Sequence, residues 1–240
     1  MRPDNRTNDQ LRPVRIETGV NLHAEGSALI HFGDTSVLCL ATVEDRVPSH
    51  RKGTGSGWVT AEYAMLPRAT VSRAARESVV GRLGGRTHEI QRLIGRSLRA
   101  AVDLGMLGER TVIVDCDVLQ ADGGTRTAAI SGGFVALYLA LRKLHQSGEL
   151  KQLPVRCHVG AVSAGMVEGE PRLDLNYQED YLADTDLNCV MTDSGHFVEV
   201  QATAEGQAFT PAQLESMLEL ASVGVKQIIE AQKHVLSQSS

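Results

Sequence analysis

A turn of small residues that holds one arginine is the first candidate for chemistry in this sequence. Residues 121–134 read ADGGTRTAAISGGF and lie between a strand-like run and a helix-like run. Helix N-termini bind anions through free N–H groups and a positive dipole, and glycines let an oxyanion approach the backbone. We therefore expect Gly124, Thr125 and Arg126 to hold an anion. An ordinary turn with Thr127 as N-cap is the alternative, and the pattern matches neither a Walker loop nor GxGxxG.

A run of acids is the second candidate. Residues 168–188 read EGEPRLDLNYQEDYLADTDLN, and in a strand Asp184, Asp186 and Asn188 share one face. Asp180 reaches the same place across a short turn. Clustered carboxylates without nearby histidine or cysteine suit a hard cation, Mg²⁺ or Mn²⁺, and a carboxyl whose pKa is raised by its neighbours also serves as a general acid. A solvated acidic loop is the alternative interpretation.

Arginines dominate residues 68–99, which contain no lysine and only two acids. They are Arg68, Arg73, Arg76, Arg82, Arg86, Arg92, Arg96 and Arg99. The guanidinium fork suits bidentate contacts to phosphate, whereas lysine acts as a point charge. The last three share one helix face by their spacing. The alternatives are a solvated surface and ion pairs with a neighbouring subunit.

These residues must be positioned by two groups of strands and helices. The expected strands are residues 14–20, 27–45 with a hairpin at Gly33-Asp34, 58–66, 111–120, and two later hairpins at 155–177 and 186–204. The expected helices are residues 85–104, 130–144 and 210–236, the last with Thr210 as N-cap and Pro211 at its first position. This order predicts an α+β fold with helices packed on mixed sheets. We expect one domain over 1–240, with lobes at 10–148 and 154–240.

Composition places the chain among soluble globular proteins. It has 240 residues, 42% of them hydrophobic and 22% charged, with a net charge of −5. The N-terminus lacks the apolar region of a signal peptide, and we see no apolar run near the roughly 20 residues that span a bilayer. We therefore expect a cytoplasmic protein without membrane contact. The four cysteines form no CxxC pair and are expected to be buried free thiols: Cys39, Cys116, Cys157 and Cys189.

Other kinds of site find little support. The eight histidines are scattered without metal-ligand spacing, and there is no GxSxG nucleophile motif. Trp58 adjoins a glycine-rich loop, where a core or interface role is favoured over stacking on a base.

Five segments in succession resemble the motifs of the bacterial ribonuclease PH family, which shares its fold with polynucleotide phosphorylase and the exosome ring. They are QLRPVRIETG, GSALIHFGDTSVLC, GGRTHEIQRLIGRSLRAAVDL, DCDVLQADGGTRTAAISGGF and LDLNYQEDYLADTDLNCVMT, and the resemblance covers nearly the whole chain. It implies duplicated βαβα-type units and a homo-hexamer built as a trimer of dimers. It also implies a phosphate-dependent 3′→5′ exoribonuclease that trims tRNA precursors and releases nucleoside 5′-diphosphates, with addition of nucleotides in reverse and rRNA as a further possible substrate.

The resemblance also assigns roles to residues. Arg86, Gly124, Thr125 and Arg126 fall at the family's phosphate-binding positions. Asp180 and Asp186 fall where related enzymes hold the divalent metal and the catalytic carboxylate, and Asp184 is a third candidate. The other arginines are expected to contact the RNA backbone or a neighbouring subunit. They are Arg68, Arg73, Arg76, Arg92, Arg96 and Arg99.

Two departures from the family pattern stand out. Asn188 replaces a lysine of the metal site in polynucleotide phosphorylase, which bears on the metal geometry. Asn5 replaces the glycine that is usual at its position, in an N-terminal end that we expect at the surface or an interface. Two other functions remain open: a catalytically silent RNA-binding ring subunit and a nuclease that uses water in place of phosphate.

Overall fold

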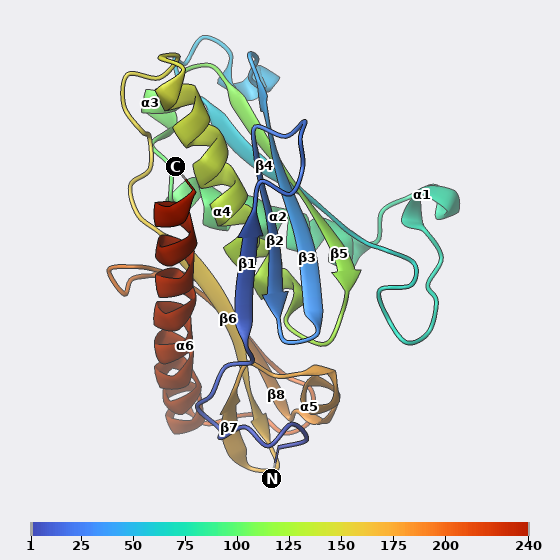
Figure 1. Cartoon of the computed structure of the whole chain (residues 1–240). Helices are drawn as coiled ribbons and strands as arrows, with labels where there is room; N and C mark the ends of the chain where they lie inside the picture. The colour runs from blue at the N-terminus through green and yellow to red at the C-terminus, as the bar shows by residue number, and fades with distance from the viewer. Residues whose placement is uncertain (1, 240) are drawn as a thin grey trace.

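The computed structural model describes residues 2–239, apart from the side chains of residues 78 and 80, and arranges them as two sheets with helices packed between and beside them (Figure 1). The first sheet has the order β1-β2-β3-β5-β4 and the second the order β7-β6-β8-β9. Strand β4 runs parallel to β5, and every other pairing in the two sheets is antiparallel. This confirms the α+β class, although only the first sheet is mixed.

The strands follow the alternation of apolar residues closely. Their bounds are β1 Val14–Thr18, β2 Gly26–Phe32, β3 Thr35–Glu44, β4 Trp58–Met65, β5 Thr111–Gln120, β6 Val159–Val167, β7 Glu170–Leu173, β8 Thr185–Thr192 and β9 Phe197–Ala204. The hairpin between β2 and β3 turns at Gly33-Asp34 as predicted, and β5 has its predicted bounds. Of the cysteines, three are buried free thiols and Cys157 is partly exposed, so the prediction of complete burial is wrong for it.

The helices are α1 Glu77–Val80, α2 Gly85–Ala100, α3 Leu104–Leu107, α4 Thr125–Gln146, α5 Tyr177–Leu182 and α6 Pro211–Gln238, with a 3-10 turn at Ser49–Arg51. Helix α6 begins as predicted: Thr210 and Gln213 form a reciprocal capping box and Pro211 is the first helical residue. It packs on β6, β7 and β1.

Helix α4 lies between the two sheets, in contact with β2 and β3 on one side and β6 on the other (Figure 1). Gly132 permits this approach, because a Cβ there would stand 2.6 Å from Cγ2 of Ile30. Contrary to the sequence-based expectation, α4 is long and apolar enough to cross a membrane by length and composition, yet 78% of its apolar window is buried inside the protein. It is the central core helix.

The start of α4 differs from the prediction. The helix begins at Thr125, five residues earlier than expected, and its N-cap is Gly124 rather than Thr127. Gly124 has a φ of 64°, which glycine adopts without steric cost. The hydroxyl of Thr127 donates back to the carbonyl of Gly124 at 2.9 Å. Thr125 and Arg126 are therefore helical residues. The division into lobes near residues 149–154 stays a prediction.

Candidate functional site

A cavity of about 470 Å³ brings the predicted site residues together. Its lining comes from the N-terminal turns of α2 and α4, from α5 and from β8. It includes all of the predicted phosphate-binding and metal-binding residues: Arg86, Gly124, Thr125, Arg126, Asp180 and Asp186. Positions that are up to 100 residues apart in the chain thus meet on one surface.

One part of the cavity is built to hold an anion. Arg86 and Arg126 are each the second residue of a helix, α2 and α4, so both guanidinium groups stand beside the positive end of a helix dipole. No side chain caps α4, whose first-turn N–H groups remain available to an oxyanion. Gly123 has a φ of 74°, and a Cβ there would stand 2.4 Å from the carbonyl oxygen of Leu175. Only glycine fits this turn.

The hydroxyl of Thr125 is held by a tyrosine that the sequence did not reveal. The phenol oxygen of Tyr63, at the end of β4, lies 2.8 Å from Oγ1 of Thr125. Tyr63 is 4% exposed, and burial raises the pKa of its phenol. A neutral phenol that donates to Oγ1 leaves the threonine proton free to point at an anion in the cavity.

The same cavity carries the two carboxylates. Burial and then the charge of Asp180 raise the pKa of Asp186 to about 6, while Arg126 opposes the shift. Burial also raises the pKa of Asp180, and Arg86 and Arg126 again oppose it. Nδ2 of Asn188 donates to Oδ2 of Asp186 at 3.0 Å, so the predicted shared face of β8 is confirmed for this pair.

The carboxylate pair fits Mg²⁺ or Mn²⁺. The charge of Asp180 disfavours ionisation of Asp186, and a divalent cation bound to both would relieve that repulsion. Within residues 2–239 no group of three or more His, Cys, Asp or Glu could hold a metal. Mg²⁺ commonly binds one or two carboxylates and completes its shell with water and phosphate oxygens. The amide of Asn188 holds one of the two carboxylates in place.

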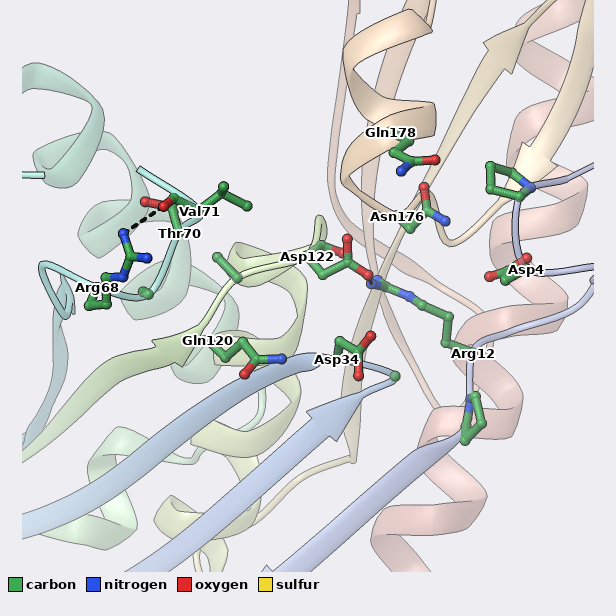
Figure 2. A pocket seen from close by; sticks show the side chains of 15 residues that line it. Asp4, Arg12, Asp34, Arg68, Thr70, Val71, Gln120, Asp122, Asn176 and Gln178 are labelled. Carbon is green, nitrogen blue, oxygen red and sulfur yellow. Dashed lines mark hydrogen bonds and ion pairs between the residues drawn. The ribbon is translucent and has the colours of Figure 1, made fainter. Parts of the chain in front are cut away.

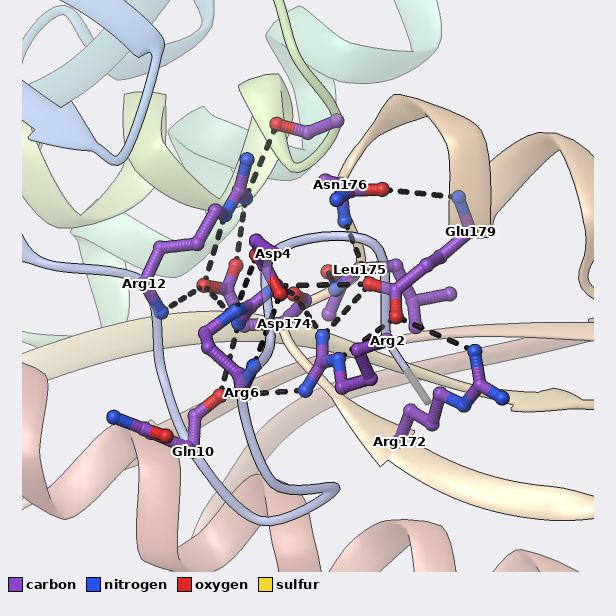
Figure 3. A network of polar contacts seen from close by, with 12 residues as sticks. Arg2, Asp4, Arg6, Gln10, Arg12, Arg172, Asp174, Leu175, Asn176 and Glu179 are labelled. Atoms are coloured by element: carbon purple, nitrogen blue, oxygen red, sulfur yellow. Dashed lines mark hydrogen bonds and ion pairs between the residues drawn. The ribbon is translucent and has the colours of Figure 1, made fainter.

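The N-terminal end lies at the surface as expected, with Pro3, Asp4 and Asn5 exposed, but its arginine side chains enter a buried ion-pair network (Figure 3). Arg2 and Arg6 are 3% and 9% exposed. Arg2 donates to both carboxylate oxygens of Glu179 at 2.7 Å. Asn5 has a φ of 62°, which explains why a glycine suits this position. Because Glu179 precedes Asp180 on α5, the network fixes the helix that carries the carboxylate.

Arg12 joins this network to the anion-binding turn. Its guanidinium contacts both carboxylate oxygens of Asp174, at 2.7 and 3.0 Å, and donates to the carbonyl oxygens of Asp122 and Gly123. One buried side chain therefore ties the turn before α4 to the segment before α5.

Other predicted residues lie elsewhere. Asp184 is exposed and is not among the residues that line the cavity. Arg96 pairs with Glu199 at 2.6 Å, and Arg99 stacks at 4.3 Å on Trp58, which is partly buried. These two guanidinium groups have intramolecular partners. Of the other arginines predicted to contact RNA or a neighbouring subunit, Arg68, Arg73, Arg76 and Arg92 are exposed.

Several lining residues were missed from the sequence: Thr70, Ser163, Tyr177, Tyr181 and Glu205. Glu205 follows β9 and adds a third acid near Asp180, whose pKa it raises. No local signal marks Ser163 or Glu205. The two tyrosines lie on either side of Asp180 in the sequence, so their position beside a predicted site residue could have identified them.

A second cavity, of about 800 Å³, adjoins the first and shares Thr70 and Ala121 with it. Figure 2 shows Arg68 and Val71 on one side of this cavity and Asp4 and Arg12 on the other, with Asp122 between them. The two cavities together leave room beside the anion site for more than a phosphate group.

Comparisons with known proteins identify the family of the chain. Models of the 3′ exoribonuclease family match residues 10–143 as domain 1 and residues 157–224 as domain 2. The chain is 60% identical to ribonuclease PH of Solibacter usitatus over 98% of this chain and 99% of the relative. It is 55% identical to ribonuclease PH of Syntrophomonas wolfei subsp. wolfei over 98% of both chains.

Solved structures share the fold. Rice (Oryza sativa) Rrp46 superposes with a TM-score of 0.79 at 21% identity, over 98% of this chain and 100% of the other. A chain from the Archaeoglobus fulgidus exosome with RNA bound to the active site superposes with a TM-score of 0.80 at 24% identity, over 95% and 91%. On the family models and the two ribonuclease PH relatives, this chain belongs to the ribonuclease PH family of 3′ exoribonucleases.

Proposed function

We propose that this chain is a phosphate-dependent 3′→5′ exoribonuclease that trims the 3′ ends of tRNA precursors and releases nucleoside 5′-diphosphates. One observation carries the proposal: two arginines at two helix N-termini and a pair of carboxylates line the same cavity. The cations suit inorganic phosphate, and the carboxylates suit the oxygen that leaves.

The anion side has to overcome repulsion between two anions, because phosphate attacks a phosphodiester that is itself charged. Arg86, Arg126 and the first-turn N–H groups of α4 offset this charge and orient the attacking oxygen. Thr125 donates its hydroxyl proton to the same phosphate. A phosphate oxygen forms the new bond to the last phosphorus atom, the bond from that phosphorus to the 3′-oxygen of the preceding nucleotide breaks, and the diphosphate leaves.

The carboxylate side handles the 3′-oxygen. Asp186, with a pKa of about 6, can both take up and release a proton close to neutral pH, and Asn188 orients the carboxyl. We assign to Asp186 the delivery of this proton to the leaving oxygen. In the reverse direction the same carboxylate accepts a proton from the 3′-hydroxyl group, and a nucleotide is added.

In the alternative arrangement, with the Asp186 carboxyl ionised, Asp180 and Asp186 would together hold Mg²⁺ or Mn²⁺. The bound cation would supply positive charge at the leaving oxygen. Asp184 stays a weaker candidate, because the structure places it away from the cavity lining.

RNA is the substrate class of a 3′ exoribonuclease family, and we include tRNA precursors and rRNA ends among the proposed substrates. The proposed assembly is a homo-hexamer formed as a trimer of dimers, in keeping with the exosome cores that share this fold. The proposed location is the cytoplasm, with no membrane contact. Arg68, Arg73, Arg76 and Arg92 are the arginines best placed to contact the RNA backbone or a neighbouring subunit.

The test uses a tRNA with a short 3′ extension, Mg²⁺, and reactions with and without phosphate. We expect nucleoside diphosphates only when phosphate is present. Arg86→Ala should abolish their release while the protein stays folded, and Arg82→Ala, on the exposed segment before α2, is the matched control. Nucleoside monophosphates without phosphate would support hydrolysis instead, and no release at all would support a silent ring subunit.

A further inference from the structure

Two exposed tyrosines stand at the edge of the cavity. Tyr177 is 57% exposed and Tyr181 is 79% exposed. They are four residues apart on α5, which places them on one face of the helix, and both line the cavity that contains Arg126 and Asp180. The whole chain has only four tyrosines and one tryptophan. Half of its tyrosines are therefore exposed at a single site.

Neither ring has a structural partner of its own. Within residues 2–239 the aromatic pairs and cation–π contacts involve Trp58, Phe134, Tyr138 and two histidines, but neither tyrosine of α5. The phenol groups of Tyr177 and Tyr181 also make no hydrogen bond among these residues. Large apolar surfaces that stay exposed beside a polar cavity usually mark a binding site.

The helix that carries the rings is held rigidly. Asn176 and Glu179 form a capping box at its start, and the backbone N–H of Tyr177 donates to Oδ1 of Asp122 at 3.1 Å. Glu179 is further held by Arg2 through two bonds of 2.7 Å. The rings therefore project from a fixed helix, so they need little ordering when a ligand binds.

We propose that Tyr177 and Tyr181 form a stacking ledge for the bases at the 3′ end of the RNA. This proposal rests on the proposed function, because it needs the scissile phosphate to lie at Arg86 and Arg126. Asp180 lies between the two tyrosines on α5 and lines the same cavity as the two arginines. A nucleotide whose phosphate lies at the arginines would therefore have its base beside α5.

Stacking fits an enzyme that must remove any nucleotide. Every base has a π face, so an aromatic ledge binds all four bases, whereas hydrogen bonds to base edges would select among them. In this proposal the arginines bind the phosphate groups of the RNA, and the two tyrosine rings bind only its bases. The ledge should therefore lower KM for RNA and leave KM for phosphate unchanged.

The experiment measures phosphorolysis of an oligoribonucleotide with an ordinary 3′ nucleotide and of the same RNA with an abasic 3′ nucleotide. We expect Tyr181→Ala and Tyr177→Ala each to raise KM for the ordinary RNA by about tenfold, from the usual strength of base stacking on an aromatic side chain. Tyr181→Phe and Tyr177→Phe keep the ring and should keep KM. The abasic RNA should bind weakly to the wild type and show no further loss in the alanine variants.

Leu182→Ala is the matched control, because Leu182 is 63% exposed on the same helix but does not line the cavity. Sedimentation of every variant separates stacking from subunit contact. An unchanged KM for RNA in both alanine variants overturns the ledge. An equal loss with abasic RNA, or dissociation of the assembly in those variants, also overturns it. If the wild type releases no nucleoside diphosphate in the presence of phosphate, the proposed function is wrong, and the ledge proposal that rests on it is wrong as well.

Discussion

Arg12 and Asp174 form a buried bidentate ion pair that connects the residues before β1 to the segment before α5. Nη2 of Arg12 lies 2.7 Å from Oδ1 of Asp174, and Nε lies 3.0 Å from Oδ2. The arginine is 4% exposed and the aspartate 1% exposed. The same guanidinium reaches the carbonyl oxygens of Asp122 and Gly123, so this pair helps to fix the position of the phosphate turn relative to the carboxylates.

Arg12→Lys should destabilise the protein and slow the reaction. Lysine keeps the charge but cannot reproduce the planar fork, so bonds to Asp174 and to the turn are lost inside the protein. We expect the free energy of unfolding to fall by roughly 3 kcal/mol, at the lower end of the range for breaking a buried pair, because lysine keeps the charge. Chemical denaturation measures it. Arg15→Lys, at an exposed arginine of β1, should change little, and equal losses in both variants would contradict the role of Arg12.

Tyr63→Phe should weaken phosphate binding specifically. The variant removes the hydroxyl that holds Oγ1 of Thr125, so the threonine loses its fixed orientation toward the anion. One hydrogen bond is worth about 1 kcal/mol, which corresponds to about a fivefold rise in KM for phosphate. Steady-state kinetics with varied phosphate and constant RNA will measure this. Tyr138→Phe is the control, because Tyr138 lies on α4 more than three turns after Thr125. A similar rise in KM for phosphate in Tyr138→Phe would argue against the positioning role of Tyr63.

Asp180→Asn should remove most activity, whereas Asp184→Asn should not. Asp180 lines the cavity and Asp184 does not, although the sequence offers both as candidates. We expect at least a hundredfold loss of kcat in the first variant and less than a twofold change in the second. Added Mg²⁺ should raise the melting temperature of the wild type but not that of Asp180→Asn. This measurement does not depend on catalytic turnover. Loss of activity in Asp184→Asn would restore that residue to the site.

Asp115→Asn should stabilise the protein at high pH. Burial, followed by the charges of Glu62 and Asp117, raises the pKa of Asp115 in the folded state. The folded protein therefore holds this proton more tightly than the unfolded chain does, and the associated stability is lost as the pH rises through the folded pKa. The neutral amide of Asp115→Asn avoids that loss. We expect its free energy of unfolding at pH 8 to exceed that of the wild type by roughly 0.5 kcal/mol, once solvent screening is included.

Unfolding curves from pH 4 to pH 8 test this expectation. The difference between Asp115→Asn and the wild type should grow with pH and vanish near pH 4. Glu170→Gln, which removes an exposed acid from β7, controls for the change in net charge. A difference that stays the same at every pH would contradict the assignment.

Local patterns predicted much of the secondary structure. Alternation gave the bounds of β5, a Gly-Asp pair gave the turn between β2 and β3, and Thr210 with Pro211 gave the start of α6. Such features depend on residues within a few positions of one another, so they can be recognised in the chain alone. The start of α4 was placed too late, because its cap is a backbone conformation of Gly124 and not a side chain.

The sequence by itself determined the kinds of group in the site: arginines, a glycine turn and a carboxylate pair. Only the tertiary structure decided which of them meet. Asp184 and Asp186 are two residues apart, yet only Asp186 lines the cavity and takes a pKa of about 6 from burial beside Asp180. The buried position of Arg2, Arg6 and Arg12 depends on carboxylates more than 160 residues away. Burying a charge is favourable only with a well-placed partner, and the partner is set by the fold.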